Sequence, residues 1–255
     1  IRSGGTIAFA MECAERGLID QPSLRFGDAN ALLTAIDQIG TREGLGNALG
    51  EGSRRFAENV GQNSLDFAPQ VKGLEIPGYE PRALQTMALG FAVGSRGADH
   101  NRSGAYEVDF SDAVDRRAVD IDAVPLAIAT EDKAAVMDSA IVCKFLRGVF
   151  DDFFGEVAHM LHLVTGWNID CQELRATAER IVTAKKRFNI ESGWTPAEDT
   201  LPARMLTEKL PDDQRAELSA ERLQRLVRQY NTLRGWSPEG WLDDAPACRD
   251  KLPRR

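Results

Sequence analysis

Helical periodicity recurs along almost the whole chain, and no segment sustains a strict alternation of apolar and polar residues. Apolar residues spaced by three and four mark at least six segments, which is the pattern of helices that bury one face. The first segment begins at once with Ile7 and Met11, and Gly17 is placed to end it. We therefore predict a mostly α-helical fold, with at most short strands near residues 68–78 and 104–110.

Further helices are predicted wherever this spacing resumes. Asp28 is placed to cap one helix through its side chain, and Thr130 is placed to cap another. Residues 101–129 are irregular and acidic, so no helix is predicted there. The predicted helices cover residues 28–36, 45–60, 82–93, 131–149, 151–164, 170–188 and 217–231.

Residues 63–81 interrupt the helical pattern. This segment holds three prolines and an apolar run at residues 71–76, which favours an extended connector or a short strand. We predict a domain boundary there, so that residues 1–69 form the end of one helical domain and residues 70–255 form a second. A chain of 255 residues with 43% apolar content is long enough to bury a large core.

The overall charge argues against nucleic acid as a partner. The net charge is −8 and the pI is near 5.1, whereas binding a polyanion needs clustered lysine and arginine. No stretch approaches the roughly 20 consecutive apolar residues that cross a bilayer. We therefore predict no membrane span.

The cysteines fit neither a zinc clip nor a disulfide framework. Cys13, Cys143, Cys171 and Cys248 are too far apart for the first and too few for the second. A reducing compartment, and hence the cytoplasm, is expected. The sequence starts at Ile1 inside a helical pattern, so we expect it to begin within a longer protein, where a targeting signal would not be visible.

Two short motifs carry the chemistry. Residues 138–144 read Asp-Ser-Ala-Ile-Val-Cys-Lys, and residues 95–100 read Ser-Arg-Gly-Ala-Asp-His. Further upstream, residues 71–75 read Val-Lys-Gly-Leu-Glu and lead through a proline-containing stretch toward the second motif. Together they indicate a metal-cofactor site of which this chain supplies only part.

Two later segments repeat a short pattern. Residues 188–194 and 230–236 both read aromatic-Asn-x-x-x-Gly-Trp, which by itself is typical of turns that close helices. With the two motifs, these turns resemble the tungsten-containing aldehyde ferredoxin oxidoreductase family over most of the chain. The resemblance implies the C-terminal portion of such an enzyme: the end of its helical middle domain and its helical C-terminal domain, without the N-terminal sheet domain.

Cys143 has two interpretations. Its neighbours Val136, Met137 and Phe145 have helical spacing, and a free cysteine on such a helix is usually a small buried hydrophobe. The resemblance implies instead the cysteine of the family's Asp-x-x-Gly-Leu-Cys motif, which gives an iron-sulfur cluster its fourth thiolate. The chain's other cysteines do not have the spacing of the remaining three ligands.

The same motif implies contacts to a pterin. In the family its aspartate, here Asp138, hydrogen-bonds pterin ring nitrogens, and neighbouring backbone groups, among them those of Val142, hold the same cofactor. Ile141 stands where the motif has glycine, and because a β-branched residue resists positive φ, we expect a more regular backbone there. Arg102 is the candidate for binding the pterin or a phosphate.

His100 is the only histidine in a glycine-rich, loop-like setting. The resemblance implies the histidine beside the tungsten centre, which can donate a hydrogen bond or a proton to an oxygen of the substrate or the metal. Imidazole suits this role because its pKa lies near neutrality. His159 and His162 lie in a predicted helix, where packing is expected. A shared site requires His100 and residues 138–144 to reach one face of the fold.

The resemblance thus implies an enzyme that oxidises aldehydes to carboxylic acids. Its cofactors would be a tungsten or molybdenum bis-pterin and a 4Fe-4S cluster, and its partners a small aldehyde and ferredoxin or a cluster-bearing electron-transfer subunit. A homodimer or larger assembly is expected. Two alternatives stay open: a family branch that reduces aromatic thioesters or oxidises sugar-phosphate aldehydes, and a helical packing module that is inactive on its own.

Overall fold

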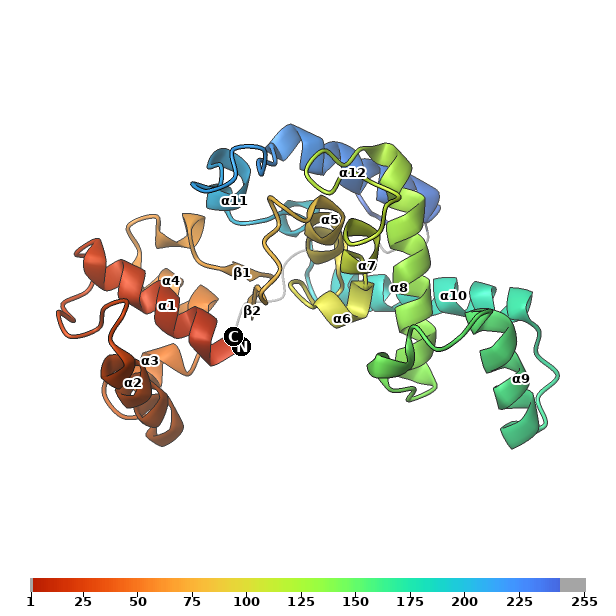
Figure 1. Cartoon of the computed structure of the whole chain (residues 1–255), viewed down its shortest axis with the longest axis horizontal. Helices are drawn as coiled ribbons and strands as arrows, with labels where there is room; N and C mark the ends of the chain where they lie inside the picture. Colours follow the sequence, from red (N-terminus) through yellow and green to blue (C-terminus); the bar gives the residue numbers. More distant parts are fainter. Residues whose placement is uncertain (1, 244–255) are drawn as a thin grey trace.

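The computed structural model describes residues 2–243 and confirms the mostly helical fold. Figure 1 shows α1 to α4 at one end, α5 to α7 beneath α11 and α12 in the middle, and α9 at the other end. The helices and strands are α1 (Arg2–Glu15), α2 (Ala29–Thr41), α3 (Leu45–Leu49), α4 (Ser53–Val60), β1 (Gln70–Val71), β2 (Leu74–Glu75), α5 (Gln85–Val93), α6 (His100–Ser103), α7 (Tyr106–Asp109), α8 (Val124–Ser139), α9 (Phe153–Thr165), α10 (Cys171–Glu191), α11 (Ala203–Thr207) and α12 (Ala220–Leu233).

The first four helices pack around aromatic side chains. The ring of Phe9 lies 5.9 Å from that of Phe56 and 5.2 Å from that of Phe67, measured between centroids. Asp28 caps α2 as predicted, because its carboxylate accepts hydrogen bonds from the backbone N–H groups of residues 30 and 31. The single helix predicted at residues 45–60 is wrong: Gly52, with φ of 88°, divides it into α3 and α4.

A two-stranded antiparallel hairpin follows, where a short strand was predicted. Its turn consists of Lys72 and Gly73, which have φ of 53° and 82°. Positive φ at both central residues is the pattern of a type I′ turn, which matches the twist of the paired strands. The other predicted strand, at residues 104–110, is wrong, because α7 occupies that stretch.

The hairpin is fixed to the helices on both sides of it. The carboxylate of Glu75 is buried and accepts hydrogen bonds from the backbone N–H and hydroxyl of Ser53, at 2.8 and 3.0 Å, and from the Thr6 hydroxyl at 3.3 Å. On the other side, the ammonium of Lys72 donates to the carbonyl oxygens of Ala92 and Gly94 at the end of α5. The hairpin therefore joins α1 and α4 to α5.

Helix α5 is the centre of the second group of helices, and every one of its residues is buried. Its N-terminus is capped from a distance, because the carboxylate of Asp109 accepts from the N–H groups of Thr86 and Met87 at 3.0 and 2.8 Å. Helices α6, α7, α8 and α12 all pack against α5. The loop that leaves α5 carries the residues 95–100 motif toward α8 (Figure 1).

Helix α8 is displaced from its prediction at both ends. It begins at Val124 rather than at residue 131, with Pro125 in its first turn, where the missing N–H costs nothing. It ends at Ser139 rather than at residue 149. The spacing of Ile141 and Phe145 looked helical, yet their side chains are 92% and 96% exposed. Because these apolar residues face away from any core, their periodicity does not mark a helix.

Three buried apolar clusters underlie this arrangement. One contains residues from 7 to 68, a second contains residues from 71 to 242, and a third contains residues from 136 to 178 around the ends of α8, α9 and α10. The first two clusters fall on either side of the boundary predicted at residues 69 and 70, which stays a prediction. Within residues 2–243, no helix is both long and apolar enough to cross a membrane.

Candidate functional site

Helix α6 packs against α8 and brings two of the predicted site residues into contact. The guanidinium of Arg102 forms an ion pair with Oδ2 of Asp138. The ammonium of Lys144 lies 3.1 Å from the other carboxylate oxygen. Asp138 is mostly buried, at 21% side-chain exposure, so its charge is held between two cations. Helix α6, which begins at the last residue of the 95–100 motif, therefore contacts the first residue of the 138–144 motif.

The end of α8 gives the chain its direction toward Cys143. The N–H of Val142 donates to the carbonyl of Met137 at 2.8 Å, and that of Ile141 donates to the carbonyl of Asp138. This is a Schellman cap, in which the first residue past the helix has left-handed geometry. Ile141 has φ of 56°, so the expectation of a regular backbone there is wrong. The cap imposes the glycine-like conformation on a β-branched residue, at a cost of about 1–2 kcal/mol.

Val142 and Cys143 point to different environments. Val142 is half-buried and packs against the cluster around the ends of α8, α9 and α10. Cys143 is an exposed, free cysteine at the start of a 3₁₀ turn, Lys144–Leu146. The interpretation of Cys143 as a buried hydrophobe on a helix is therefore wrong. By contrast, Cys13 is fully buried, and burial raises the pKa of its thiol to about 11.

His100 is the first residue of α6 and lies among aromatic rings. Its imidazole centroid is 5.0 Å from the ring of Tyr79 and 5.9 Å from that of Tyr106, and the two tyrosines stack at 4.9 Å. Burial is the main cause that lowers the pKa of His100, with Arg147 acting in the same direction and Asp99 opposing them. These surroundings favour the neutral form of the His100 imidazole over the charged form.

Long-range contacts hold the loop that precedes His100. The side-chain amide of Asn189 on α10 donates to the carbonyl of Ser95 at 2.7 Å, and Lys72 donates to the carbonyl of Gly94 at 3.0 Å. Gly97 has φ of 75°, and a Cβ added there would lie 2.0 Å from the carbonyl oxygen of Val71. The hairpin and α10 therefore fix the path of the backbone into His100.

Several cations surround this face. The guanidinium of Arg147 donates to the Asn101 side chain at 3.2 Å and pairs with Glu107 at 3.1 Å. Lys185 lies on α10, and its pKa is lowered chiefly by burial, with Arg102 and Lys144 acting in the same direction. The carboxylates of Glu131 and Asp138 oppose this effect at Lys185. Carboxylates thus accompany the cations, and this face carries charges of both signs.

Sequence reasoning missed Tyr79, Tyr106, Arg147, Lys185 and Asn189. Tyr79 lies in the proline-containing stretch upstream of the residues 95–100 motif, and its ring lies against that of His100. Tyr106 on α7 and Arg147 lie only a few residues beyond the two motifs, whereas Lys185 and Asn189 come from α10, far from either motif along the chain. His159 and His162 are both exposed on α9. Within residues 2–243, neither forms a hydrogen bond to Arg102 or Asp138, and His162 instead contacts the carbonyl of Trp167.

The described residues do not hold a complete metal site. Within residues 2–243, no three side chains of histidine, cysteine, aspartate or glutamate are grouped closely enough to bind a metal ion. An iron-sulfur cluster takes four thiolates, and on this face Cys143 supplies one exposed sulfur. The described residues of this face therefore offer such a cluster no more than one thiolate.

Comparison with known proteins identifies the family of this chain. The family described as "Aldehyde ferredoxin oxidoreductase, domains 2 & 3" matches residues 1–247. The match therefore covers nearly the whole of this chain. It is 35% identical to the tungsten-containing aldehyde ferredoxin oxidoreductase of Pyrococcus furiosus over 223 residues, and 36% identical to that of Pyrococcus horikoshii over 231 residues. The chain belongs to the aldehyde ferredoxin oxidoreductase family.

The match covers unequal shares of the two proteins. It includes 83% of this chain but only 36% of either Pyrococcus enzyme, so the chain spans about a third of their length. A more distant relative, 25% identical, is the "Aliphatic sulfonate oxidoreductase, WOR-like subunit" of Pyrococcus furiosus. Among solved structures, the BamBC active-site complex of benzoyl coenzyme A reductase shares the fold, with a TM-score of 0.65 and 19% identity over 92% of this chain and 41% of that one.

Proposed function

We propose that this chain forms part of a tungsten-dependent enzyme that oxidises aldehydes to carboxylic acids. The observation that carries the proposal is the identity of about 35% to tungsten-containing aldehyde ferredoxin oxidoreductases along the chain. It is supported by the ion pair between Arg102, on the helix that begins at His100, and Asp138 of the 138–144 motif. The fold neighbour at 19% identity is too distant to favour thioester reduction over aldehyde oxidation.

Cys143 is proposed as one thiolate ligand of a 4Fe-4S cluster. Its sulfur is exposed and unpaired, and the Schellman cap fixes the direction in which the chain presents it. A rigid turn suits a ligand because the cluster then binds without ordering a loop. The other three thiolates come from segments outside the described residues or from another chain.

Asp138, Val142 and Arg102 are proposed to hold a pterin. Both oxygens of Asp138 already accept from cations, yet each retains a second lone pair that can accept from a pterin N–H. A carboxylate accepts hydrogen bonds more strongly than a neutral carbonyl group does. Arg102 is 39% exposed and can turn one of its remaining N–H groups to an anionic group of the cofactor. Backbone groups at Val142 lie in the same turn.

His100 is proposed as the group that donates a hydrogen bond or a proton during the reaction. When bound, the metal centre would supply two-electron redox chemistry and the cluster would supply one-electron transfer. The protein's own share is to position the substrate and the proton. A neutral imidazole can donate from one ring nitrogen and accept at the other, and the rings of Tyr79 and Tyr106 restrict its orientation and partly exclude water.

The wider setting follows from the family and is proposed with the reaction. The cofactor is a tungsten or molybdenum bis-pterin. Ferredoxin or a cluster-bearing subunit accepts the electrons, and the enzyme works in the cytoplasm as a homodimer or larger assembly. A segment corresponding to the family's N-terminal sheet domain covers the face that carries Asp138 and Cys143. On its own, without that cover, the chain is a helical module that does not turn over.

Metal analysis and turnover test this proposal together. The complete protein, purified without oxygen, is expected to contain tungsten or molybdenum and about four irons per chain for each cluster. It should reduce ferredoxin, or a viologen dye in its place, when a small aldehyde is added, and the matching carboxylic acid should accumulate. Protein that holds both metals but leaves aldehydes unchanged would place the chain in another branch of the family.

A further inference from the structure

A buried group of charges lies beside the loop that leads into His100. The carboxylate of Asp199 is 2% exposed and faces two ammonium groups, with Nζ of Lys72 2.7 Å from Oδ1 and Nζ of Lys186 3.1 Å from Oδ2. The indole N–H of Trp194 also donates to Oδ1, at 2.9 Å. Asp199 is thus the common partner of side chains from the hairpin, from α10 and from the turn after α10.

Lys72 connects this group to the loop. Its ammonium has three acceptors, which are one oxygen of Asp199 and the carbonyl oxygens of Ala92 and Gly94. An ammonium group donates three hydrogen bonds, so each donor has a partner. The Gly94 carbonyl also accepts from the backbone N–H of Gly97 at 3.0 Å, which closes the first turn of the loop. Lys72 therefore holds this turn by its first residue.

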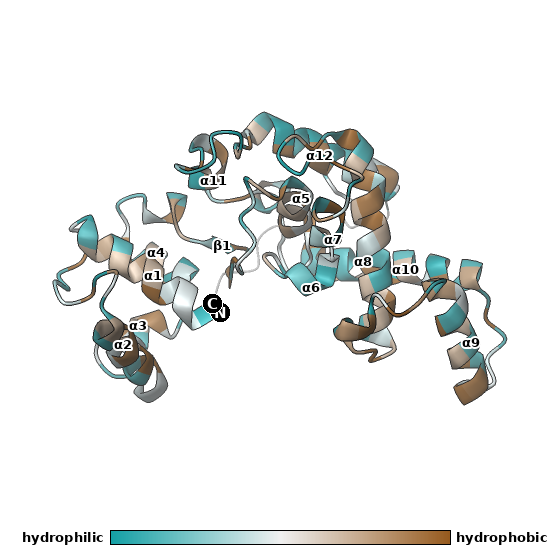
Figure 2. Cartoon of the chain, in the orientation of Figure 1, coloured by the Kyte–Doolittle hydropathy of each residue, from teal (hydrophilic) through white to brown (hydrophobic). Residues whose placement is uncertain are grey.

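Apolar packing does little to hold the same segment. Figure 2 shows α6 as hydrophilic, and among residues 94–99 only Ala98 has an apolar side chain. One methyl group buries little apolar surface, so the loop depends on its polar contacts. These include the Asn189 amide on the carbonyl of Ser95 and the Lys72 ammonium on that of Gly94.

The turn that closes α10, residues 188–194, reaches the loop by two routes. Its Asn189 side chain donates to the loop directly. Its Trp194 side chain donates to Asp199, which in turn faces Lys72. The backbone N–H of Trp194 donates to the carbonyl of Asn189 at 2.9 Å, so both side chains extend from one hydrogen-bonded turn.

We propose that Asp199 is a positioning residue for His100, on which it acts through Lys72 and the loop at residues 94–99. The inference rests on the proposed role of His100 in aldehyde oxidation. The Lys72 side chain is only 9% exposed, and a buried ammonium without a counter-charge is costly. The Asp199 carboxylate supplies that counter-charge beside the loop. A displacement of about 1 Å in a reacting group lowers turnover by about 100-fold, so a loosened loop impairs His100.

The two lysines of this group give a matched comparison. Lys72→Met and Lys186→Met each remove one ammonium and leave Asp199 facing the other. Of the two lysines, Lys72 alone donates to the loop within residues 2–243. Hydrogen exchange of the complete protein, followed by mass spectrometry, should therefore be at least about tenfold faster at residues 94–104 in Lys72→Met and within about twofold of wild type in Lys186→Met. Equal exchange in the two variants would overturn the proposal.

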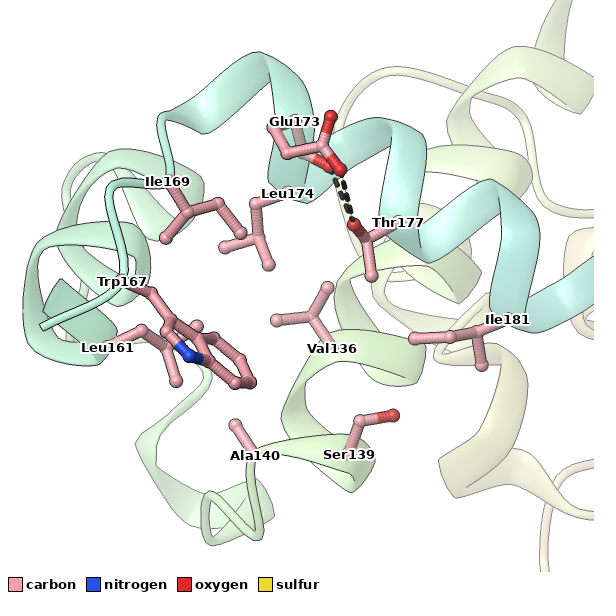
Figure 3. A pocket seen from close by; sticks show the side chains of 10 residues that line it. All are labelled: Val136, Ser139, Ala140, Leu161, Trp167, Ile169, Glu173, Leu174, Thr177 and Ile181. Atoms are coloured by element: carbon pink, nitrogen blue, oxygen red, sulfur yellow. Dashed lines mark hydrogen bonds between the residues drawn. The ribbon is translucent and has the colours of Figure 1, made fainter. Parts of the chain in front are cut away.

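The other end of α10 serves as the internal reference. Figure 3 shows Leu174, Thr177 and Ile181 of α10 along an apolar groove that Val136 of α8 also lines. Exchange there should stay unaltered in Lys72→Met, because loss of a local contact opens one segment, whereas loss of global stability speeds exchange throughout. Equal acceleration at the groove and at the loop would overturn the proposal.

Asp199→Asn tests the route itself. Asparagine keeps the size of the side chain but removes its charge, so the loop should open as in Lys72→Met. The double variant should exchange within about twofold of Lys72→Met alone, because Asp199 then has no partner beside the loop to act through. Effects that multiply would overturn the proposal. If Asp199→Asn does not fold, Trp194→Phe removes the N–H donated to Asp199 and should speed exchange about threefold in the wild type but not in Lys72→Met.

Turnover separates this inference from the proposed function. Asp199→Asn should lower kcat for a small aldehyde by about 10- to 100-fold and leave KM within about twofold, because a misplaced imidazole affects the chemical step. In His100→Ala the same change should have no further effect, and a further loss there would overturn the inference. If the wild type oxidises no aldehyde, the proposed function fails, and hydrogen exchange alone decides whether Asp199 holds the loop.

Discussion

The two segments that carry the site residues are positioned in opposite ways. Residues 138–144 follow a helix and are directed by its own C-terminal cap, whose hydrogen bonds span only a few residues. Residues 94–100 form a loop held by Lys72 and Asn189, which lie more than twenty and ninety residues away respectively. A local device thus presents Cys143, and a set of distant contacts presents His100.

This difference separates what each segment can do. A cap built into one helix holds a metal ligand rigidly even when the surrounding domain moves, because its hydrogen bonds belong to a single element. A loop fixed by the hairpin and by α10 couples His100 to the relative position of both. We therefore expect the position of Cys143 to tolerate changes elsewhere in the fold, and the position of His100 to respond to changes far from it.

Replacing Cys143 tests the ligand side and should give the largest effect. Cys143→Ala removes one thiolate, so the iron content of the complete enzyme should fall and electron transfer to ferredoxin should be lost, while tungsten stays bound. Iron and tungsten analysis beside a ferredoxin reduction assay measures this. The control is Cys171→Ala, at a partly buried cysteine on α10. Full iron and activity in Cys143→Ala would refute the ligand role.

Replacing His100 tests the other segment. His100→Ala should leave both metals in place and lower turnover on the order of 10²- to 10⁴-fold, the range for losing a positioned acid or base. Because burial lowers the pKa of His100, wild-type turnover should decline only as pH falls through that lowered value and not near pH 7. His159→Ala, an exposed histidine on α9, is the control. Wild-type rates in His100→Ala would make His100 a structural residue.

Two glycines with the same backbone angle allow the contact between the loop before His100 and the hairpin to be tested separately from backbone strain. Gly97 and Gly166 both have φ of 75°, but a Cβ at Gly97 meets the Val71 carbonyl at 2.0 Å, whereas a Cβ at Gly166 meets nothing within 4 Å. Gly166→Ala should lower the free energy of unfolding by about 1 kcal/mol through backbone strain alone. Gly97→Ala adds a steric clash and should cost about 2–4 kcal/mol.

Denaturant unfolding of the two variants measures this difference. Turnover should follow it, with Gly97→Ala impaired through the displaced His100 and Gly166→Ala close to wild type. If both alanine variants lose the same stability, the hairpin does not constrain the loop as the structure indicates. If only Gly166→Ala loses activity, the comparison between the two segments is wrong.

The fold was largely predictable from the sequence, and the parts that failed have identifiable causes. The periodicity of apolar residues predicted long amphipathic helices such as α10 and α12, and Asp28 caps α2 as expected. The end of α8 failed because exposed apolar residues at positions 141 and 145 continued a helical spacing without a core to face. Periodicity reports burial only where a partner surface exists.

The candidate site was predictable in its motifs but not in its surroundings. The pairing of Arg102 with Asp138 was not anticipated, although both were candidates, because it depends on how α6 packs on α8. Asn189 was noted only as part of a helix-closing turn, yet its side chain anchors the loop before His100. Contacts between residues so distant in sequence follow from the tertiary fold, and a single sequence holds no local pattern for them.

The smallest effect expected concerns the backbone strain in the cap itself. Ile141 has φ of 56° and an almost fully exposed side chain. Its left-handed geometry therefore costs free energy that its side-chain packing hardly offsets. Ile141→Gly should raise the free energy of unfolding by about 0.5–1 kcal/mol, because glycine adopts this conformation without strain.

Ala140→Gly changes the neighbouring residue, whose φ of −85° is right-handed, and should lower that free energy by about 0.5–1 kcal/mol. Opposite signs in a denaturant titration would confirm that the cap strains position 141. A loss of stability in both variants would mean that the isoleucine side chain contributes contacts that outweigh the strain.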